Sequence, residues 1–216
     1  MDVADACREV GIHPVAKTAG YITAEARPEF YKHMDAANVD LKAFTEDFYK
    51  KLTLSALQPV LDTLVYLKKE TRVWFEITNL VIPGENDSDQ EFHDMTEWIA
   101  RNLGLDVPLH FTAFHPDFRM LDHPPTPAAT LSRARTIALS KGLRYVYTGN
   151  VHDSVGGSTY CHHCGQLLIE RDWYKLGEYH LKNRNQCAKC GTVCAGVFGE
   201  KAGTWGPHRQ PIRISL

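Results

Sequence analysis

The sequence predicts an α/β domain followed by a small metal-binding ribbon. Short apolar runs alternate with helical stretches over most of the chain, and two Cys-x2-Cys-Gly motifs follow at 161–165 and 187–191. Alternating strands and helices are typical of a parallel sheet with right-handed crossovers, either open or curled as part of a barrel. We therefore expect a partial barrel at 1–155, a ribbon at 156–199 and a tail at 200–216 that indicates no function.

The elements of the first part follow from hydrophobic periodicity and from Gly and Pro signals. Apolar residues at helical spacing from Val3 to Val10 predict a first helix that ends at Gly11. Apolar and β-branched runs predict five strands, at about 13–18, 38–44, 72–82, 109–114 and 144–148. Helices are predicted between them at about 24–33, from 45, from 58, from the cap at 86–88 to 104, and at 127–140.

Charge and cysteine usage restrict the class of protein. The chain has 216 residues and a formal net charge of -2, so it lacks the basic field that nucleic-acid binding usually needs. Four of its six cysteines fall in the two motifs, which favours a reducing compartment over a disulfide framework. No run of about 18 apolar residues and no signal-peptide pattern is present. We expect a cytoplasmic protein that binds neither nucleic acid nor membranes.

The two Cys motifs predict a structural metal site. Each motif places two thiolates on a tight turn, and its Gly lets the backbone fold beneath the metal. Four soft thiolates in tetrahedral geometry suit Zn2+ or a lone iron ion, and we expect Zn2+. Four Cys leave no open position, so His162 and His163 are expected to lie outside the coordination sphere. The expected ligands are Cys161, Cys164, Cys187 and Cys190.

Polar residues at the carboxyl ends of the predicted strands are the candidates for chemistry, because the loops that follow parallel strands converge there. Asp40 and Lys42 stand out, since residues at i and i+2 share one face of a strand. Two interpretations stay open for them: ionisable groups placed in a barrel interior for function, or an ion pair that satisfies itself within the sheet. His115 is either a ligand contact or the cap of a strand end. The other candidates are Thr18, Asn79 and Asn150.

Four stretches of the sequence, together with the ribbon, carry a family resemblance. The stretches are 38–44 (NVDLKAF), 74–88 (WFEITNLVIPGENDS), 109–116 (LHFTAFHP) and 145–150 (YVYTGN). They closely resemble the radical S-adenosylmethionine (SAM) proteins of the AmmeMemoRadiSam system, which are relatives of pyruvate formate-lyase activating enzyme. The ribbon resembles the C-terminal module of the same family, so the resemblance extends over nearly the whole chain.

The resemblance implies a partial (β/α)6 barrel that binds SAM at the carboxyl ends of its strands. By similarity to the activating enzymes, Asp40 and Lys42 would contact the methionine and ribose parts of SAM, and His115 would lie near the adenosine. Thr18 would line the same face. The family's usual turn after this residue is Thr-Asn-Gly, whereas this chain has Ala19, which removes one side-chain amide from the expected SAM contacts.

The reaction of the family depends on a [4Fe-4S] cluster, and the sequence departs from the family there. The cluster is held by a Cys-x3-Cys-x2-Cys loop, which is absent from this sequence, as is the Gly-Gly-Glu strand end that holds the SAM amino group in relatives. Both belong to the first two βα units of the family. The chain therefore resembles a radical SAM protein truncated at its N-terminus. We expect it to be inactive alone, with its first strand left as an unpaired edge.

Several alternatives stay open for the missing part and for the function. The part is missing because the start codon was assigned too late, because the gene is broken, or because another polypeptide supplies the missing half-barrel. The expected partners are SAM, that polypeptide, and a protein substrate. An interpretation from another class is a non-catalytic zinc-ribbon interaction module on a degenerate α/β barrel. An in-frame Cys-x3-Cys-x2-Cys just upstream would favour the enzyme, and its absence would favour the module.

Overall fold

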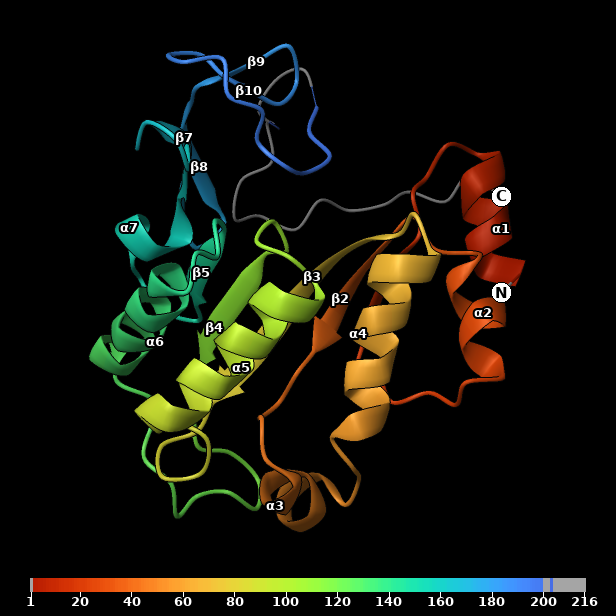
Figure 1. Ribbon diagram of the computed structural model, residues 1–216, viewed down its shortest axis with the longest axis vertical. Coiled ribbons are helices and arrows are strands. Elements are labelled where there is room, and N and C mark those ends of the chain that lie inside the picture. Colours follow the sequence, from red (N-terminus) through yellow and green to blue (C-terminus); the bar gives the residue numbers. More distant parts are fainter. Residues whose placement is uncertain (1, 200–202, 204–216) are drawn as a thin grey trace. The chain divides into compact units, whose positions relative to one another are not determined.

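The computed structural model describes residues 2–199 and 203, and the chain divides into two compact units, Met1–Val151 and His152–Leu216 (Figure 1). The first unit contains a parallel sheet with helices, and the second contains short antiparallel strands. The predicted tail at 200–216 lies outside the described residues, except for residue 203. Among the described residues, no helix is both long and apolar enough to cross a bilayer.

Five parallel strands form the sheet of the first unit, in the order in which they occur in the sequence. Each connection therefore leads to the neighbouring strand, as repeated βα units require. Within the described part of the chain β1 pairs only with β2, so the first strand is an edge as the sequence predicts. The strands are β1 (Val15–Thr18), β2 (Ala36–Asp40), β3 (Trp74–Val81), β4 (Leu109–Ala113) and β5 (Val146–Gly149).

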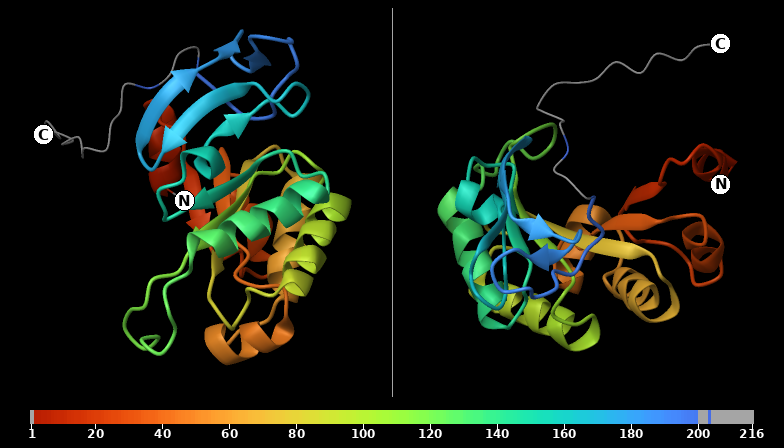
Figure 2. Two further views of the ribbon diagram at one scale, coloured as in Figure 1. Left: turned by 90° about the vertical axis from the view of Figure 1, so that its left-hand side faces the viewer. Right: turned by 90° about the horizontal axis from the view of Figure 1, so that it is seen from above.

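Helices occupy the connections and cover one side of the sheet, as the right-hand view of Figure 2 shows. Side chains along β3 alternate strictly between half-buried and buried, so one face of the sheet is packed and the other is not. The helices are α1 (Asp2–Glu9), α2 (Ala26–Tyr31), α3 (Glu46–Phe48), the π-helix η1 (Tyr49–Thr53), α4 (Gln58–Glu70), α5 (Asp89–Asn102) and α6 (Ala128–Ser140).

The hydrophobic core of the first unit lies between the packed face of the sheet and these helices. Ile77 and Phe111 point into it from β3 and β4, and the rings of Phe92 and Phe111 meet edge to face at 5.4 Å. α5 begins as the sequence predicts, because the Ser88 hydroxyl accepts a hydrogen bond from the Glu91 N–H at 3.2 Å. The predicted helical periods therefore place the apolar residues of α5 against the sheet.

The first helix is present, but its apolar stripe is not buried. α1 ends before Gly11, as predicted, yet Val3 and Val10 are 78% and 71% exposed, and Ala4 is the residue that packs inward. Helical spacing predicts where apolar residues lie on a helix, whereas burial needs a neighbouring segment. No segment in residues 2–199 covers this side of α1.

The second unit is built from short strands around two turns. Gly156 and Gly157 end a short helix, α7 (Ser154–Gly157), which Asp153 caps by accepting a hydrogen bond from the Gly156 N–H at 2.8 Å. The strands are β6 (Thr159–Tyr160), β7 (Leu167–Asp172), β8 (Lys175–Tyr179), β9 (Leu181–Lys182) and β10 (Gln186–Cys187).

Candidate functional site

The face of the sheet turned away from the helices carries polar side chains, and we call it the polar face. The strand register places these side chains on one side: Asp40 pairs with Thr78, and Thr78 pairs with His110. Such a row of polar groups on a sheet is available for binding, because the opposite face already supplies the core. The polar face comprises Lys17, Asn38, Asp40, Glu76, Thr78, His110, Thr112 and Tyr147.

Asp40 is the centre of a charge cluster at the end of β2. Its carboxylate accepts hydrogen bonds from Lys42 Nζ at 2.8 Å and from Lys17 Nζ, and the Lys17 ammonium also donates to Asn38 Oδ1 at 2.7 Å. The Asp40 side chain is 16% exposed, whereas those of Lys42 and Lys17 are 35% and 62% exposed. One carboxylate between two ammonium groups leaves a positive charge, which attracts an anionic ligand group. Lys17 is a member of this cluster that the sequence analysis missed.

The backbone that carries Lys42 is held by buried polar side chains. The strand predicted at 38–44 ends at Asp40. The carbonyl groups of the next two residues accept hydrogen bonds from side chains rather than from the backbone of a neighbouring strand. Asn79 and Asn86 Nδ2 donate to the Lys42 carbonyl at 3.0 and 2.7 Å. The Lys42 N–H donates to the Tyr49 hydroxyl at 3.2 Å, and burial raises the pKa of Tyr49 to about 12. Lys42 is therefore fixed by groups from three different segments.

A carboxylate extends this support to the next turn. Glu91, at the start of α5, accepts a hydrogen bond from the Phe44 N–H at 2.6 Å. Glu91 is 8% exposed, and its burial raises the pKa of its carboxyl group above the usual range. The sequence predicts only that Glu91 lies in a helix and does not predict this hydrogen bond, because Phe44 lies in a distant loop. No short-range pattern could have indicated the contact.

The remaining predicted site residues lie apart from the Asp40 cluster. Thr18 shares its side of β1 with Ala16, opposite to Lys17, and its hydroxyl accepts a hydrogen bond from the Gly20 N–H at 3.1 Å. His115 is exposed just after β4 and forms no hydrogen bond with any residue of the described chain. The structure therefore joins Asp40 and Lys42 by a hydrogen bond, whereas no hydrogen bond within the described chain joins Thr18 or His115 to them.

The four predicted metal ligands meet in the second unit. Their Sγ atoms all lie within 4.8 Å of one another, with 3.6 Å from Cys161 to Cys190 and 3.7 Å from Cys164 to Cys187. A disulfide would need a separation of about 2.0 Å. Tetrahedral coordination with metal–sulfur bonds of about 2.3 Å places the sulfur atoms about 3.8 Å apart. The spacing therefore fits four thiolates around one ion, and the group can bind a metal.

The turns of the two Cys motifs have the backbone that the sequence predicts. Gly165 and Gly191 have φ values of +70° and +76°, which residues with a side chain rarely adopt. The N–H of each Gly donates a hydrogen bond of 2.9 Å to the carbonyl of the first Cys of its motif. Both turns thereby direct their thiols to the same point. His162 and His163 are exposed and lie outside the four-Cys group, as expected.

Comparison with known proteins gives one sequence relative. No protein-family model matches the chain. The uncharacterized protein MJ0808 of Methanocaldococcus jannaschii is 41% identical over 191 residues, which are 88% of this chain and 56% of that protein. The chain therefore spans about half the length of the curated relative that it matches.

Solved structures identify the fold. A domain of pyruvate-formate lyase-activating enzyme from Bacteroides vulgatus superposes with a TM-score of 0.60 at 16% identity, over 69% of this chain and 88% of that chain. A radical SAM methyltransferase from Sphaerobacter thermophilus superposes with a TM-score of 0.54 at 15% identity, over 73% of this chain and 46% of that chain. At these identities the likeness is one of fold. The fold of this chain is therefore similar to that of a domain of a pyruvate-formate lyase-activating enzyme and to that of a radical SAM methyltransferase.

Proposed function

We propose that the chain is a radical SAM protein of the AmmeMemoRadiSam type, similar to the activases of glycyl-radical enzymes, and that its polar face binds SAM. The observation that carries this proposal is the Asp40 cluster. Two ammonium groups and a carboxylate lie at the carboxyl end of a parallel strand, in a unit whose fold resembles radical SAM domains. Ligands of parallel α/β units bind at this end of the strands.

The cluster has the donor set that the polar end of SAM requires. Lys42 and Lys17 offer ammonium groups to the methionine carboxylate, and Asp40 offers an acceptor to the methionine ammonium or to the ribose hydroxyls. The Lys17 and Lys42 side chains are 62% and 35% exposed, so a ligand can reach both ammonium groups. His115, which is exposed after β4, is proposed to contact the adenosine, and Thr18 to line the turn after β1.

The residues of this chain do not fit a [4Fe-4S] cluster of the radical SAM type. Four of the six cysteines form the metal group of the second unit, and Cys7 and Cys194 do not supply the Cys-x3-Cys-x2-Cys loop. We infer that the cluster ligands belong to another segment or polypeptide and that this chain is inactive alone. The edge of β1 that pairs with no strand of the described chain, where Val15 is 63% exposed, is the proposed place for the strands that carry them.

The four-Cys group is proposed to hold a structural Zn2+ ion. Its thiolates leave no position for water or substrate, and closed tetrahedral sites of this kind stabilise a fold rather than catalyse a reaction. Thiolates that remain free for a metal also fit a reducing compartment, so we propose a cytoplasmic protein. A protein substrate stays a proposed partner.

One observation favours a second candidate function, a non-catalytic interaction module. The turn between β7 and β8 presents Trp173 and Tyr174, which are 50% and 69% exposed, with their rings 6.1 Å apart. Exposed aromatic pairs are frequent in protein interfaces. In this alternative the ribbon binds a partner and the polar face binds no SAM.

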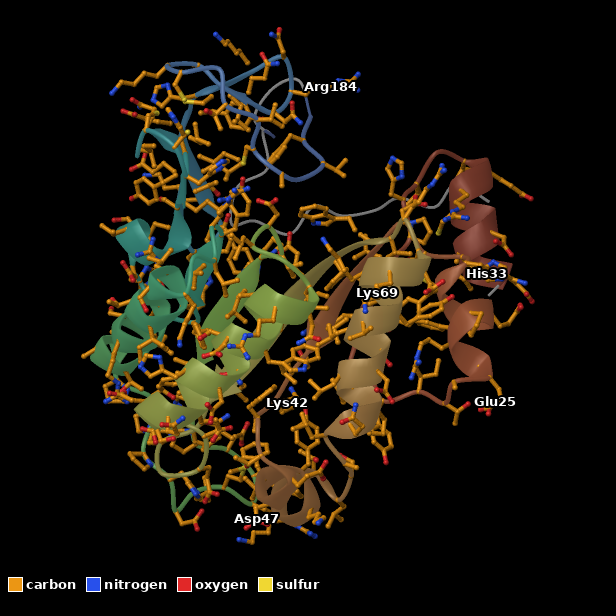
Figure 3. The ribbon with its side chains drawn as sticks, in the orientation of Figure 1. Glu25, His33, Lys42, Asp47, Lys69 and Arg184 are labelled. Atoms are coloured by element: carbon orange, nitrogen blue, oxygen red, sulfur yellow. The ribbon has the colours of Figure 1, made fainter. Side chains whose placement is uncertain are left out.

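Calorimetric titration of the whole chain with SAM tests the proposal. We expect saturable binding that Asp40→Asn and Lys42→Met each weaken about tenfold or more, because each removes a charge-assisted hydrogen bond. The matched controls are Asp47→Asn and Lys51→Met, which break an exposed ion pair of 3.3 Å near α3 and should bind SAM like the wild type (Figure 3). Equal affinities for wild type and Asp40→Asn, or no binding at millimolar SAM, would contradict the proposal and favour the interaction module.

A further inference from the structure

A second group of side chains on the polar face is not used by the proposed SAM contacts. Glu76 and His110, on the neighbouring strands β3 and β4, are joined by a hydrogen bond of 2.7 Å between Oε2 and Nε2. The other carboxylate oxygen, Glu76 Oε1, accepts a hydrogen bond from Trp74 Nε1 at 3.2 Å. Glu76 is therefore held at both oxygens and cannot turn away from the imidazole.

This arrangement fixes which nitrogen of His110 carries the proton. An ionised carboxylate only accepts hydrogen bonds, so Nε2 is the donor and, in the neutral ring, Nδ1 holds the lone pair. Carboxylate–imidazole pairs in enzymes and metal sites have the same arrangement. The carboxylate sets the tautomer, and the other ring nitrogen binds the metal or accepts a proton. The His110 ring is also fixed in orientation, because it stacks on Tyr147 with 4.9 Å between ring centroids.

The second nitrogen of His110 is accessible. His110 makes no hydrogen bond through Nδ1 to any described residue. Within the described chain, the buried side-chain atoms that lack a partner are Arg27 Nε, Tyr31 OH and Asn79 Oδ1, so Nδ1 of His110 is not a buried atom. The His110 side chain is 29% exposed in total. A fixed imidazole whose Nδ1 is neither hydrogen-bonded within the described chain nor fully buried is thus present on the polar face.

We propose that Glu76 and His110 form a binding site for a ligand that carries a hydroxyl group. Nδ1 of His110 accepts the hydrogen bond of the hydroxyl group, and Glu76 holds the imidazole in the tautomer and orientation that this bond needs. Tyr147 stacks on the imidazole of His110 and Trp74 Nε1 donates to Glu76, so both members of the pair are fixed in orientation. His110 contacts the ligand, and Glu76 acts as the positioning residue.

The pair lies on β3 and β4, whereas Lys17 lies on β1 and Asp40 ends β2, and the test of the pair needs no SAM. Imidazole nitrogens of the full chain, labelled with 15N, report the tautomer directly. Phenol serves as the probe, and anisole, which has the same ring but no donor, serves as the comparison. The matched control for a His110→Gln variant is His13→Gln, because His13 also pairs with a carboxylate, Asp35 at 2.6 Å, but on an exposed loop before β1.

The expected result has three parts. His110 is protonated at Nε2 when neutral, phenol shifts its Nδ1 resonance saturably, and anisole binds about tenfold more weakly because it offers no hydrogen. His110→Gln removes the preference for phenol, whereas His13→Gln retains it. Glu76→Gln keeps the shape of the pair but weakens the preference, since an amide no longer sets the tautomer.

Several results would overturn the proposal. An Nδ1–H tautomer for His110, equal binding of phenol and anisole, or no phenol binding at tens of millimolar would each do so. Unchanged phenol binding in His110→Gln would also contradict it. Loss of SAM binding in the same preparation would bear only on the Asp40 cluster, because the phenol titration contains no SAM.

Discussion

The first unit buries a continuous cluster of apolar side chains between a sheet and its helices, whereas the second unit gathers four thiols around one point. Among the described residues of the second unit, Leu168 and Ile169 are the buried aliphatic side chains, and the other buried apolar residues are cysteines. A segment with so few apolar groups cannot form a stable core by itself. The first unit therefore depends on apolar burial for its stability, and the second depends on its four-Cys group. The two units should unfold separately.

Removal of the metal ligands is the strongest way to test this comparison. If the four-Cys group holds the structural zinc proposed above, Cys187→Ser should unfold the ribbon and leave the first unit folded, because such an ion contributes on the order of 10 kcal/mol to the folding of small modules. Hydrogen exchange should show loss of protection in the four-Cys region and unchanged protection in β3 and β4. A chelator should reproduce the effect on the wild type. Cys7→Ser, on the exposed helix α1, is the control and should retain the metal.

A core substitution should produce the opposite pattern. Phe111 is fully buried in β4 against Phe92, so Phe111→Ala should lower the free energy of unfolding of the first unit by about 3–5 kcal/mol. Urea unfolding followed by tryptophan fluorescence measures this loss, and metal content measures the ribbon. The control is Phe118→Ala, which changes an exposed ring. Loss of the metal together with the core would show that the two units are not independent.

The smallest expected effect concerns the support of Lys42. Burial raises the pKa of Glu91 in the folded state, so the folded protein binds more protons than the unfolded chain once the pH exceeds the unfolded pKa of this group. The Glu91 contribution to stability therefore falls as pH rises above about 4.5. Glu91→Gln keeps an acceptor for the Phe44 N–H without the charge. As the pH rises from 4 to 7, the free energy of unfolding of Glu91→Gln should therefore increase relative to that of the wild type. The ribbon should not change.

The sequence alone predicted what depends on local pattern. The five strands, the capped helix α5 and the four-Cys group follow from hydrophobic period, a Ser cap and Cys spacing, and the structure confirms each. The pairing of Asp40 with Lys42 followed from their spacing, because i and i+2 share a face. These features need information from only a few consecutive residues.

Contacts between distant segments could not be predicted in this way. Lys17 joins Asp40 from a neighbouring strand, and Asn86 reaches Lys42 across 44 positions. The exposed stripe of α1 was unpredictable for the same reason, since burial depends on which segment lies beside a helix. The pairing of Glu76 with His110 likewise requires the strand register, which neither residue reveals alone.

The held backbone around Lys42 has a kinetic consequence. Asn79, Asn86 and Tyr49 already satisfy this backbone before any ligand arrives, so binding need not order a loop. Association at the Asp40 cluster should then proceed at a rate set by diffusion and charge, without a slow closing step. The residence time of a ligand would depend on how quickly the two lysines return to Asp40.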